Sequence, residues 1–211
     1  PTPPPRPDHA STSAAKTPSS SPSRTTDALS GLGSDEYADG VLPLGDGKYV
    51  TDAPKKGYVY LCHPNEEGGG AEKDGSWIHG NTWNANEKLS VTGDVAWPNA
   101  SFSMKTGNGV RSIAMNDLPT TVHTGTFPIG ANDPAYQFDR NPNAIRSQSL
   151  TFALSLSPKK LASPGCIGGE VGVMLRGVML FDAFDALLRD AVAREVQDGW
   201  GGHPQSSGEY H

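Results

Sequence analysis

Two histidines near the end of the sequence have the residue type and spacing needed to bind a metal ion. His203 and His211 lie eight positions apart in GWGGHPQSSGEYH (199–211), a stretch rich in Gly and Ser. Imidazole is the commonest neutral ligand for zinc and copper, and a glycine-containing loop of this length can turn both rings toward one point. We therefore predict a metal site with His203 and His211 as ligands. Tyr210 is its expected neighbour, and Asp198 is a carboxylate that could add to the ligand shell.

His123 is a weaker candidate for the same site. It lies in TVHTGTFPI (121–129), where strand alternation would place it on the face of Thr121 and Gly125. That face either lines a site or opens to solvent. Zinc or copper suits imidazole better than magnesium or calcium does. A calcium site assembled from several loops stays open, because only the spacing of an EF-hand loop is missing here.

Other kinds of chemistry leave fewer traces in this sequence. It contains no GxSxG, Walker-type phosphate loop, HExxH or dinucleotide fingerprint. An enzyme would have to use an open coordination position on the metal to activate water or oxygen, and no general base is identified. The alternative to a metal protein is a carbohydrate-binding or adhesion module that uses Trp77, Trp83 and Trp97, although core packing is the commoner role of such residues.

The two cysteines, Cys62 and Cys166, are the only ones in the chain and lie far apart. Neither belongs to a CxxC pair, which argues against a zinc site built on thiolates. In an exported protein such a pair is typical of one disulfide that closes a long loop. Two buried free thiols are the alternative.

Composition divides the chain into a linker over 1–40 and a folded domain over 41–211. Eighteen of residues 1–26 are Pro, Ser or Thr, so this segment lacks the apolar surface needed for folding. A Pro/Ser/Thr stalk is typical of secreted or cell-surface proteins, where it can follow a lipid or cell-wall anchor; a linker between two domains would look the same. No run is long enough to span a membrane, and the net charge of −6 argues against nucleic-acid binding.

Short apolar segments separated by Gly, Pro, Asn and Asp predict a mainly β domain of the α+β class, with antiparallel strands. Strands are expected within 57–62, 88–98, 109–115, 121–129 and 149–156. The last has a buried face of alternating apolar residues, Leu150, Phe152, Leu154 and Leu156. The segment 170–181 predicts a hairpin with a two-residue turn at Arg176 and Gly177.

One long amphipathic helix is expected near the C-terminal end. Apolar residues recur at three- and four-residue spacing from Phe181 to Val196, and charged residues fill the other side. Asp182 lies near its expected start, and Gly199 follows its expected end.

The C-terminal forty residues resemble the YHYH-domain proteins, which are named for a Tyr-His-Tyr-His motif that follows a Gly-His-Pro element. The chain has GGHP and then Tyr210 and His211, and it ends where the second Tyr-His would come. The similarity extends over 41–211, so we expect a domain that is incomplete at its C-terminal end. Trp200 stands where the family often has Cys. The resemblance implies an exported or cell-surface bacterial protein and implies no catalytic residues. In the separate adhesion alternative, the expected partner is a polysaccharide or another cell-surface molecule.

Overall fold

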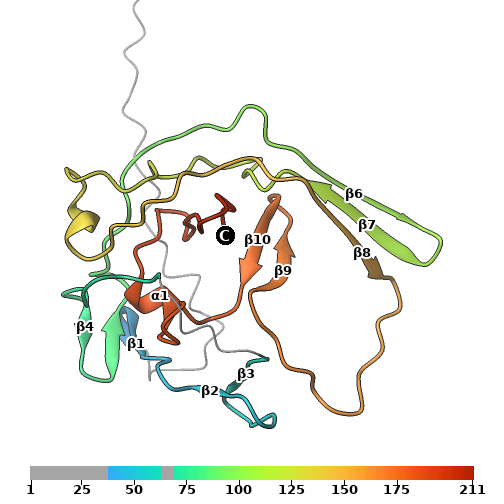
Figure 1. Ribbon diagram of the computed structural model, residues 1–211, viewed down its shortest axis with the longest axis horizontal. Coiled ribbons are helices and arrows are strands. Elements are labelled where there is room, and N and C mark those ends of the chain that lie inside the picture. The colour runs from blue at the N-terminus through green and yellow to red at the C-terminus, as the bar shows by residue number, and fades with distance from the viewer. Residues whose placement is uncertain (1–37, 63–68) are drawn as a thin grey trace, which may run out of the picture. The chain divides into compact units, whose positions relative to one another are not determined.

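The structure is a computed structural model that describes residues 38–62 and 69–211 (Figure 1). The predicted linker therefore lies outside the described residues, except for a short 3-10 helix at Ala38–Gly40. Residues Ala38–His211 belong to one unit, and the following description concerns this unit alone.

The described chain is rich in β structure, as predicted, and it folds into four small sheets rather than one large one. Three sheets are antiparallel, with strand orders β1-β5-β4, β6-β7-β8 and β10-β9, whereas β2 and β3 pair in parallel. The strands are β1 (Val41–Pro43), β2 (Tyr49–Val50), β3 (Val59–Tyr60), β4 (Ile78–His79), β5 (Thr82–Asn84), β6 (Phe102–Gly107), β7 (Val110–Met115), β8 (Leu150–Ser155), β9 (Glu170–Met174) and β10 (Val178–Phe181).

The longest sheet, β6-β7-β8, confirms the strands predicted within 109–115 and 149–156. Its predicted buried face is only half covered. Leu150 and Phe152 are partly buried in a cluster with Met179 of β10, but Leu154 and Leu156 are 45% and 42% exposed. Strand alternation fixes which residues share a face, but the sequence does not say how far the neighbouring element extends over that face.

The hairpin predicted over 170–181 is confirmed as β9 and β10, but its turn is longer than expected. Val178 pairs with Met174, so three residues, 175–177, form the loop. Gly177 has a φ of +83°, the left-handed conformation that closes a three-residue hairpin loop.

Two predicted strands are wrong. The segments 88–98 and 121–129 make only isolated bridges, Val91 with Asp198 and Val95 with Thr124. The first predicted strand is reduced to the two residues of β3. These segments have strand-like composition, but their amides donate to acceptors on several separate segments, such as Gln197, Asn141 and Asp133, so no ladder forms.

The predicted long helix is also wrong. Only Ala191–Arg194 (α1) is α-helical, and Leu188 has a left-handed φ of 59°. Aspartate side chains compete with the helix, because Asp182 accepts from the Phe184 amide and Asp185 accepts from the amides of two following residues. The apolar residues do recur at helical spacing, but the amides that a helix would need donate to aspartate side chains in local turns. No helix in residues 38–62 and 69–211 is long and apolar enough to cross a membrane.

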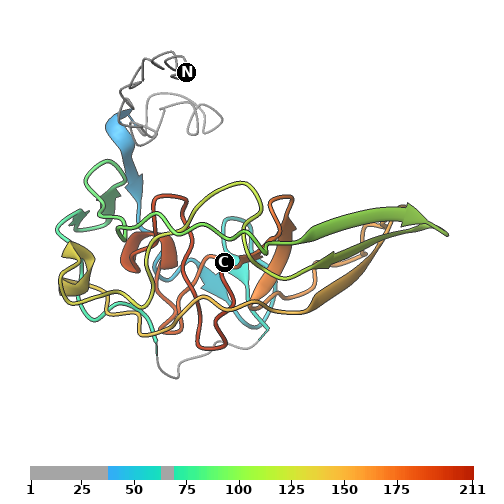
Figure 2. The same cartoon turned by 90° about the horizontal axis from the view of Figure 1, so that it is seen from above.

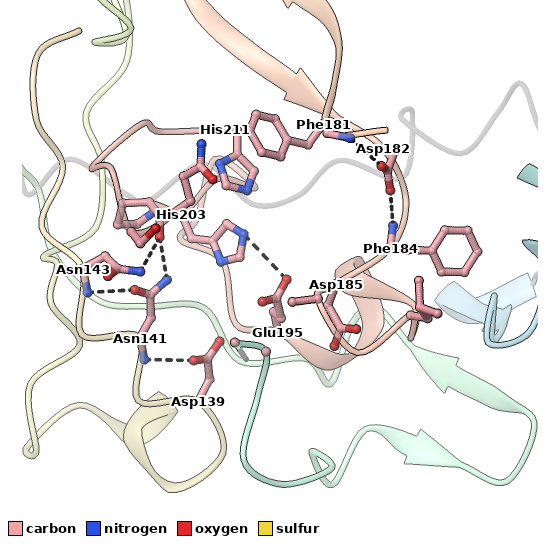
Figure 3. Close-up of a pocket in the computed structure, with 18 of the residues that line it drawn as sticks. Asp139, Asn141, Asn143, Phe181, Asp182, Phe184, Asp185, Glu195, His203 and His211 are labelled. Carbon is pink, nitrogen blue, oxygen red and sulfur yellow. Dashed lines mark hydrogen bonds and ion pairs between the residues drawn. The ribbon is translucent and has the colours of Figure 1, made fainter. Parts of the chain in front are cut away.

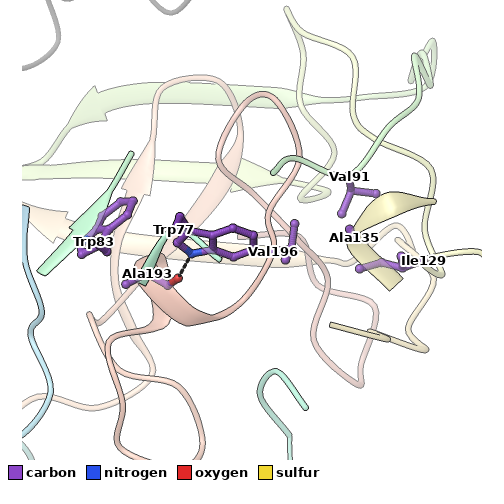
Figure 4. Close-up of a cluster of buried hydrophobic side chains, with 7 residues drawn as sticks. All are labelled: Trp77, Trp83, Val91, Ile129, Ala135, Ala193 and Val196. Carbon is purple, nitrogen blue, oxygen red and sulfur yellow. Dashed lines mark hydrogen bonds between the residues drawn. The ribbon is translucent and has the colours of Figure 1, made fainter. Parts of the chain in front are cut away.

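The main core lies around Trp77, which is fully buried (Figure 4). Its indole Nε1 donates a hydrogen bond of 2.7 Å to the Ala193 carbonyl and thereby ties α1 to the β4–β5 region. Trp83 is also buried in this core, which confirms packing as the role of these two tryptophans. The cluster consists of Trp77, Trp83, Val91, Ile129, Ala135, Ala193 and Val196.

The predicted disulfide between Cys62 and Cys166 is present. It lies beside a parallel bridge between Leu61 and Ile167, so it holds β3 against the segment that leads into β9. The bond closes a loop of 104 residues, a length at which a cross-link strongly reduces the entropy of the unfolded chain.

Candidate functional site

The C-terminal segment folds into a small hairpin that brings His203 and His211 together. Their backbones exchange two hydrogen bonds, from the His203 amide to the His211 carbonyl at 2.9 Å and in the reverse direction at 3.1 Å. Directly opposed residues of such a pair lie on the same side of the hairpin. The two rings meet edge to face with centroids 4.7 Å apart.

A cavity of about 770 Å³ opens beside this histidine pair (Figure 3). The hairpin forms one wall, and Asn141–Asn143 and the loop 181–188 form others. The side-chain amides of Asn141 and Asn143 both donate to the Pro204 carbonyl, so the hairpin is held against the wall that these two residues form.

Glu195 contributes a carboxylate to the same cavity. It follows α1 directly, and its Oε2 lies 3.7 Å from His203 Nε2. Burial, together with the charges of Asp139 and Asp185, raises the pKa of this carboxyl to about 8. At neutral pH Glu195 is therefore mostly protonated. No hydrogen bond among the described residues involves the Glu195 side chain. A proton on Glu195 would face His203 Nε2.

Both histidines are neutral at neutral pH. Burial lowers the pKa of His203 to about 3, with smaller contributions from the charges of His211 and Lys88. Burial likewise lowers the pKa of His211 to about 4. A neutral imidazole keeps a lone pair on one nitrogen, which is the form that binds metals and accepts protons.

The two rings differ in how they are held. His211 stacks on Phe181 with centroids 3.8 Å apart, and its Nδ1 lies 3.4 Å from the Glu209 carbonyl. His203 is only 7% exposed, and its Nδ1 is the one buried side-chain nitrogen or oxygen in the described residues that has no hydrogen-bond partner. A buried polar atom without a partner is costly, so it indicates a place where a ligand, ion or water completes the structure.

The other carboxylates of the cavity are already occupied by the protein. Asp139 accepts hydrogen bonds from the amides of Val196 and Asn141, and Asp185 is paired with Arg189 at 2.8 Å. These groups build the walls and hold them at fixed positions. Of the described carboxylates that line the cavity, Glu195 is the one that accepts no hydrogen bond.

Tyr210 and Asp198 belong to a different environment from His211. The Asp198 carboxylate accepts four hydrogen bonds, which come from the Tyr210 hydroxyl and from the amides of Gly125, Trp200 and Gly202. Both side chains are buried and neither lines the cavity. Burial and the nearby Asp198 charge raise the pKa of Tyr210, so its phenol stays protonated.

His123 is also placed away from the cavity. Its ring is half exposed and its Nδ1 contacts Asp94 at the surface. Of the five residues predicted for the metal site, the structure brings together His203 and His211 and leaves Tyr210, Asp198 and His123 outside the cavity lining.

Sequence reasoning missed Glu195 and Phe181. Glu195 looked like one polar residue among several on an amphipathic helix, and Phe181 looked like the first apolar residue of that helix. No spacing rule links either residue to the hairpin. Glu195 reaches His203 because the chain changes direction between 195 and 203, and Phe181 reaches His211 across 30 residues of sequence. The only available signal was a carboxylate shortly before a histidine motif.

In the described parts of the chain, no three His, Cys, Asp or Glu side chains form a group already arranged to hold a metal ion. No protein-family model, no curated protein and no solved structure matches this chain. The functional argument therefore depends on the geometry of the cavity.

Proposed function

We propose that the cavity binds a divalent transition-metal ion through His203 and His211, with Glu195 as a third ligand. The observation that carries the proposal is the pair of buried, neutral imidazoles placed side by side by the hairpin. Protons compete weakly with a metal for such nitrogens at neutral pH, because both pKa values lie far below 7.

The position of Glu195 supports its role as third ligand. Ligand atoms bound at about 2.0–2.2 Å around a tetrahedral ion lie roughly 3.4 Å from one another. His203 Nε2 and Glu195 Oε2 are 3.7 Å apart, so a small movement would suit both. Binding would release the proton that Glu195 carries at neutral pH, since metals bind the ionised carboxylate.

The charge of the cavity also favours a cation. Five of the described residues that line it are Asp or Glu and none is Lys or Arg; of the five, Glu195 is mostly protonated at neutral pH and Asp185 is paired with Arg189. Two imidazoles favour zinc or copper over calcium, which prefers a shell of oxygen atoms. His211 would have to leave part of its contact with Phe181 to complete the shell, so we expect its ring to move on binding.

Isothermal titration calorimetry of the chain with zinc or copper sulfate tests the proposal. We expect single-site binding by the wild type and by His123→Ala, which removes an exposed histidine outside the cavity. The double variant His203→Ala, His211→Ala should lose the heat, and Glu195→Gln should bind at least about tenfold more weakly. Equal heats in the wild type and the double variant would overturn the proposal.

A second candidate is proton transfer to a small organic ligand, and the size of the cavity favours it. About 770 Å³ is far more than one ion occupies and falls in the range of small-molecule sites. Glu195, whose pKa of about 8 keeps it protonated at neutral pH, would serve as the proton donor. Thermal-shift screening of small polar compounds in the presence of EDTA tests this candidate: a compound must stabilise the wild type and not Glu195→Gln.

We also propose that the protein is exported. The disulfide between Cys62 and Cys166 supports this location, because such bonds persist mainly in oxidising compartments. The resemblance to YHYH-domain proteins stays a prediction, as does the association with a cell-surface polysaccharide. Trp77 and Trp83 are buried, so of the three predicted tryptophans only the partly buried Trp97 remains available to a glycan.

A further inference from the structure

One face of the β6-β7-β8 sheet carries exposed apolar side chains, Met104 and Leu154, beyond the part that the rest of the unit covers. Cross-strand pairing places Met104, Ile113 and Phe152 in one row and Thr106, Arg111 and Leu154 in the next. The β9–β10 hairpin packs on this face near Met115 and Ile113 through Val173, Met179 and Phe181. The row with Leu154 lies farther out, toward the turn between β6 and β7, where the sheet extends away from the core (Figures 1 and 2).

The uncovered end carries both large apolar and basic side chains. Met104, Leu154 and Leu156 are 44%, 45% and 42% exposed, and Leu161 is 69% exposed. Leu156 comes directly after the end of β8, and the chain continues into Lys159, Lys160 and Leu161. We call the following residues the distal surface: Met104, Arg111, Leu154, Leu156, Lys159, Lys160 and Leu161.

The charge of this region is opposite to that of the whole chain. Residues 102–115 and 150–169 contain four basic residues, Lys105, Arg111, Lys159 and Lys160, and no acidic residue, whereas the whole chain has a net charge of −6. None of the ion pairs found among the described residues involves these four cations. The distal surface is thus positive without internal compensation, and a negatively charged partner would complement it.

The apolar side chains decide the class of partner. A hydrophilic polyanion would neutralise the cations but leave four large apolar side chains in water. The surface of an anionic bilayer offers negative headgroups to Lys and Arg and an apolar boundary to Leu and Met. We propose that the distal surface binds anionic lipid membranes peripherally. This inference does not depend on the metal site.

Vesicle co-sedimentation tests the proposal. We expect the chain to bind vesicles of phosphatidylcholine mixed with phosphatidylglycerol and not to bind vesicles of phosphatidylcholine alone. High salt should dissociate the bound protein. Each cation near an anionic surface changes the partition coefficient roughly fivefold, so Lys159→Glu with Lys160→Glu should weaken binding at least about twentyfold. Leu154→Gln with Leu156→Gln should weaken binding at unchanged charge.

The matched control is Lys55→Glu with Lys56→Glu, an equal charge change at two adjacent exposed lysines in another loop. It should reduce binding much less than the Lys159 and Lys160 variant, and thermal unfolding should show that all variants stay folded. Equal loss in the control would overturn the proposal, because it would indicate only nonspecific attraction. Binding to dextran sulfate but not to vesicles, or a dimer that disappears with Leu154→Gln and Leu156→Gln, would also overturn it.

Discussion

The two sides of the C-terminal hairpin differ in whether their buried polar groups have hydrogen-bond partners. On the Tyr210 side, the hydroxyl donates to Asp198 at 2.9 Å and the backbone amide donates to Asp117. On the other side, His203 is equally buried, but its Nδ1 has no partner among the described residues and its Nε2, the nitrogen proposed to bind the metal, faces Glu195.

This difference separates residues that hold the hairpin from residues that are available to a ligand. Neighbouring positions in one strand face opposite sides, so Tyr210 and His211 have different roles despite their adjacency. A satisfied network stabilises the fold, whereas an unsatisfied buried group lowers stability and persists where it serves binding. Substitutions on the two sides should therefore affect stability and metal binding separately.

The largest loss of stability is expected for Asp198→Ala. The substitution leaves three backbone amides and the Tyr210 hydroxyl without their acceptor in a buried place. We expect the free energy of unfolding to fall by about 4 kcal/mol or more, measured by urea denaturation. A loss below about 1 kcal/mol would mean that this side is not the structural one.

The next effect concerns pH and the opposite side. The pKa of Glu195 is raised from 4.5 to about 8 in the fold, so between these values the folded protein binds a proton that the unfolded chain has lost. The free energy of unfolding should therefore decrease as pH rises through this range, by on the order of 3 kcal/mol from this group.

Glu195→Gln removes this contribution. The difference in the free energy of unfolding between the wild type and the variant therefore isolates Glu195 from other titrating groups. Urea denaturation of metal-free protein at about pH 5 and about pH 8 should show the variant gaining stability relative to the wild type at the higher pH. A pH-independent difference would contradict the assigned burial of Glu195.

Tyr210→Phe sharpens the same contrast with a smaller change. It removes one hydrogen bond and leaves Asp198 with its three amide donors. We expect a loss of about 1–2 kcal/mol in thermal or urea unfolding. Zinc affinity should stay within about twofold of the wild type, since the hydroxyl does not face the cavity.

The smallest change in stability is expected for His203→Leu. This substitution replaces a buried ring that has an unpartnered nitrogen by an apolar side chain, which is neutral or stabilising when the space is filled. We expect a change within about 1 kcal/mol together with loss of zinc binding by calorimetry. A large loss of stability with zinc binding retained would reverse the assignment of the two sides.

The sequence predicted local strand and hairpin patterns well, but it did not predict where the chain changes direction. The β7, β8 and β9–β10 predictions were confirmed because alternation and turn residues act over a few positions. The long helix failed because Asp182 and Asp185 capture nearby amides, which an apolar period does not reveal.

The site shows the same limit. The proximity of His203 and His211 followed from a short hairpin, whose contacts lie within nine residues. Glu195 and Phe181 join them only through long-range packing, and three of the four donors to Asp198 are backbone amides, which leave no mark in the sequence.

X-ray absorption spectroscopy of the zinc-loaded protein tests the metal proposal most directly. The account predicts a first shell of nitrogen and oxygen at about 2.0–2.1 Å, with the outer-shell scattering of two imidazoles. That imidazole signal should be lost in the His203→Ala, His211→Ala variant and kept in His123→Ala. Zinc bound without imidazole, or the same spectrum in the double variant, would contradict it.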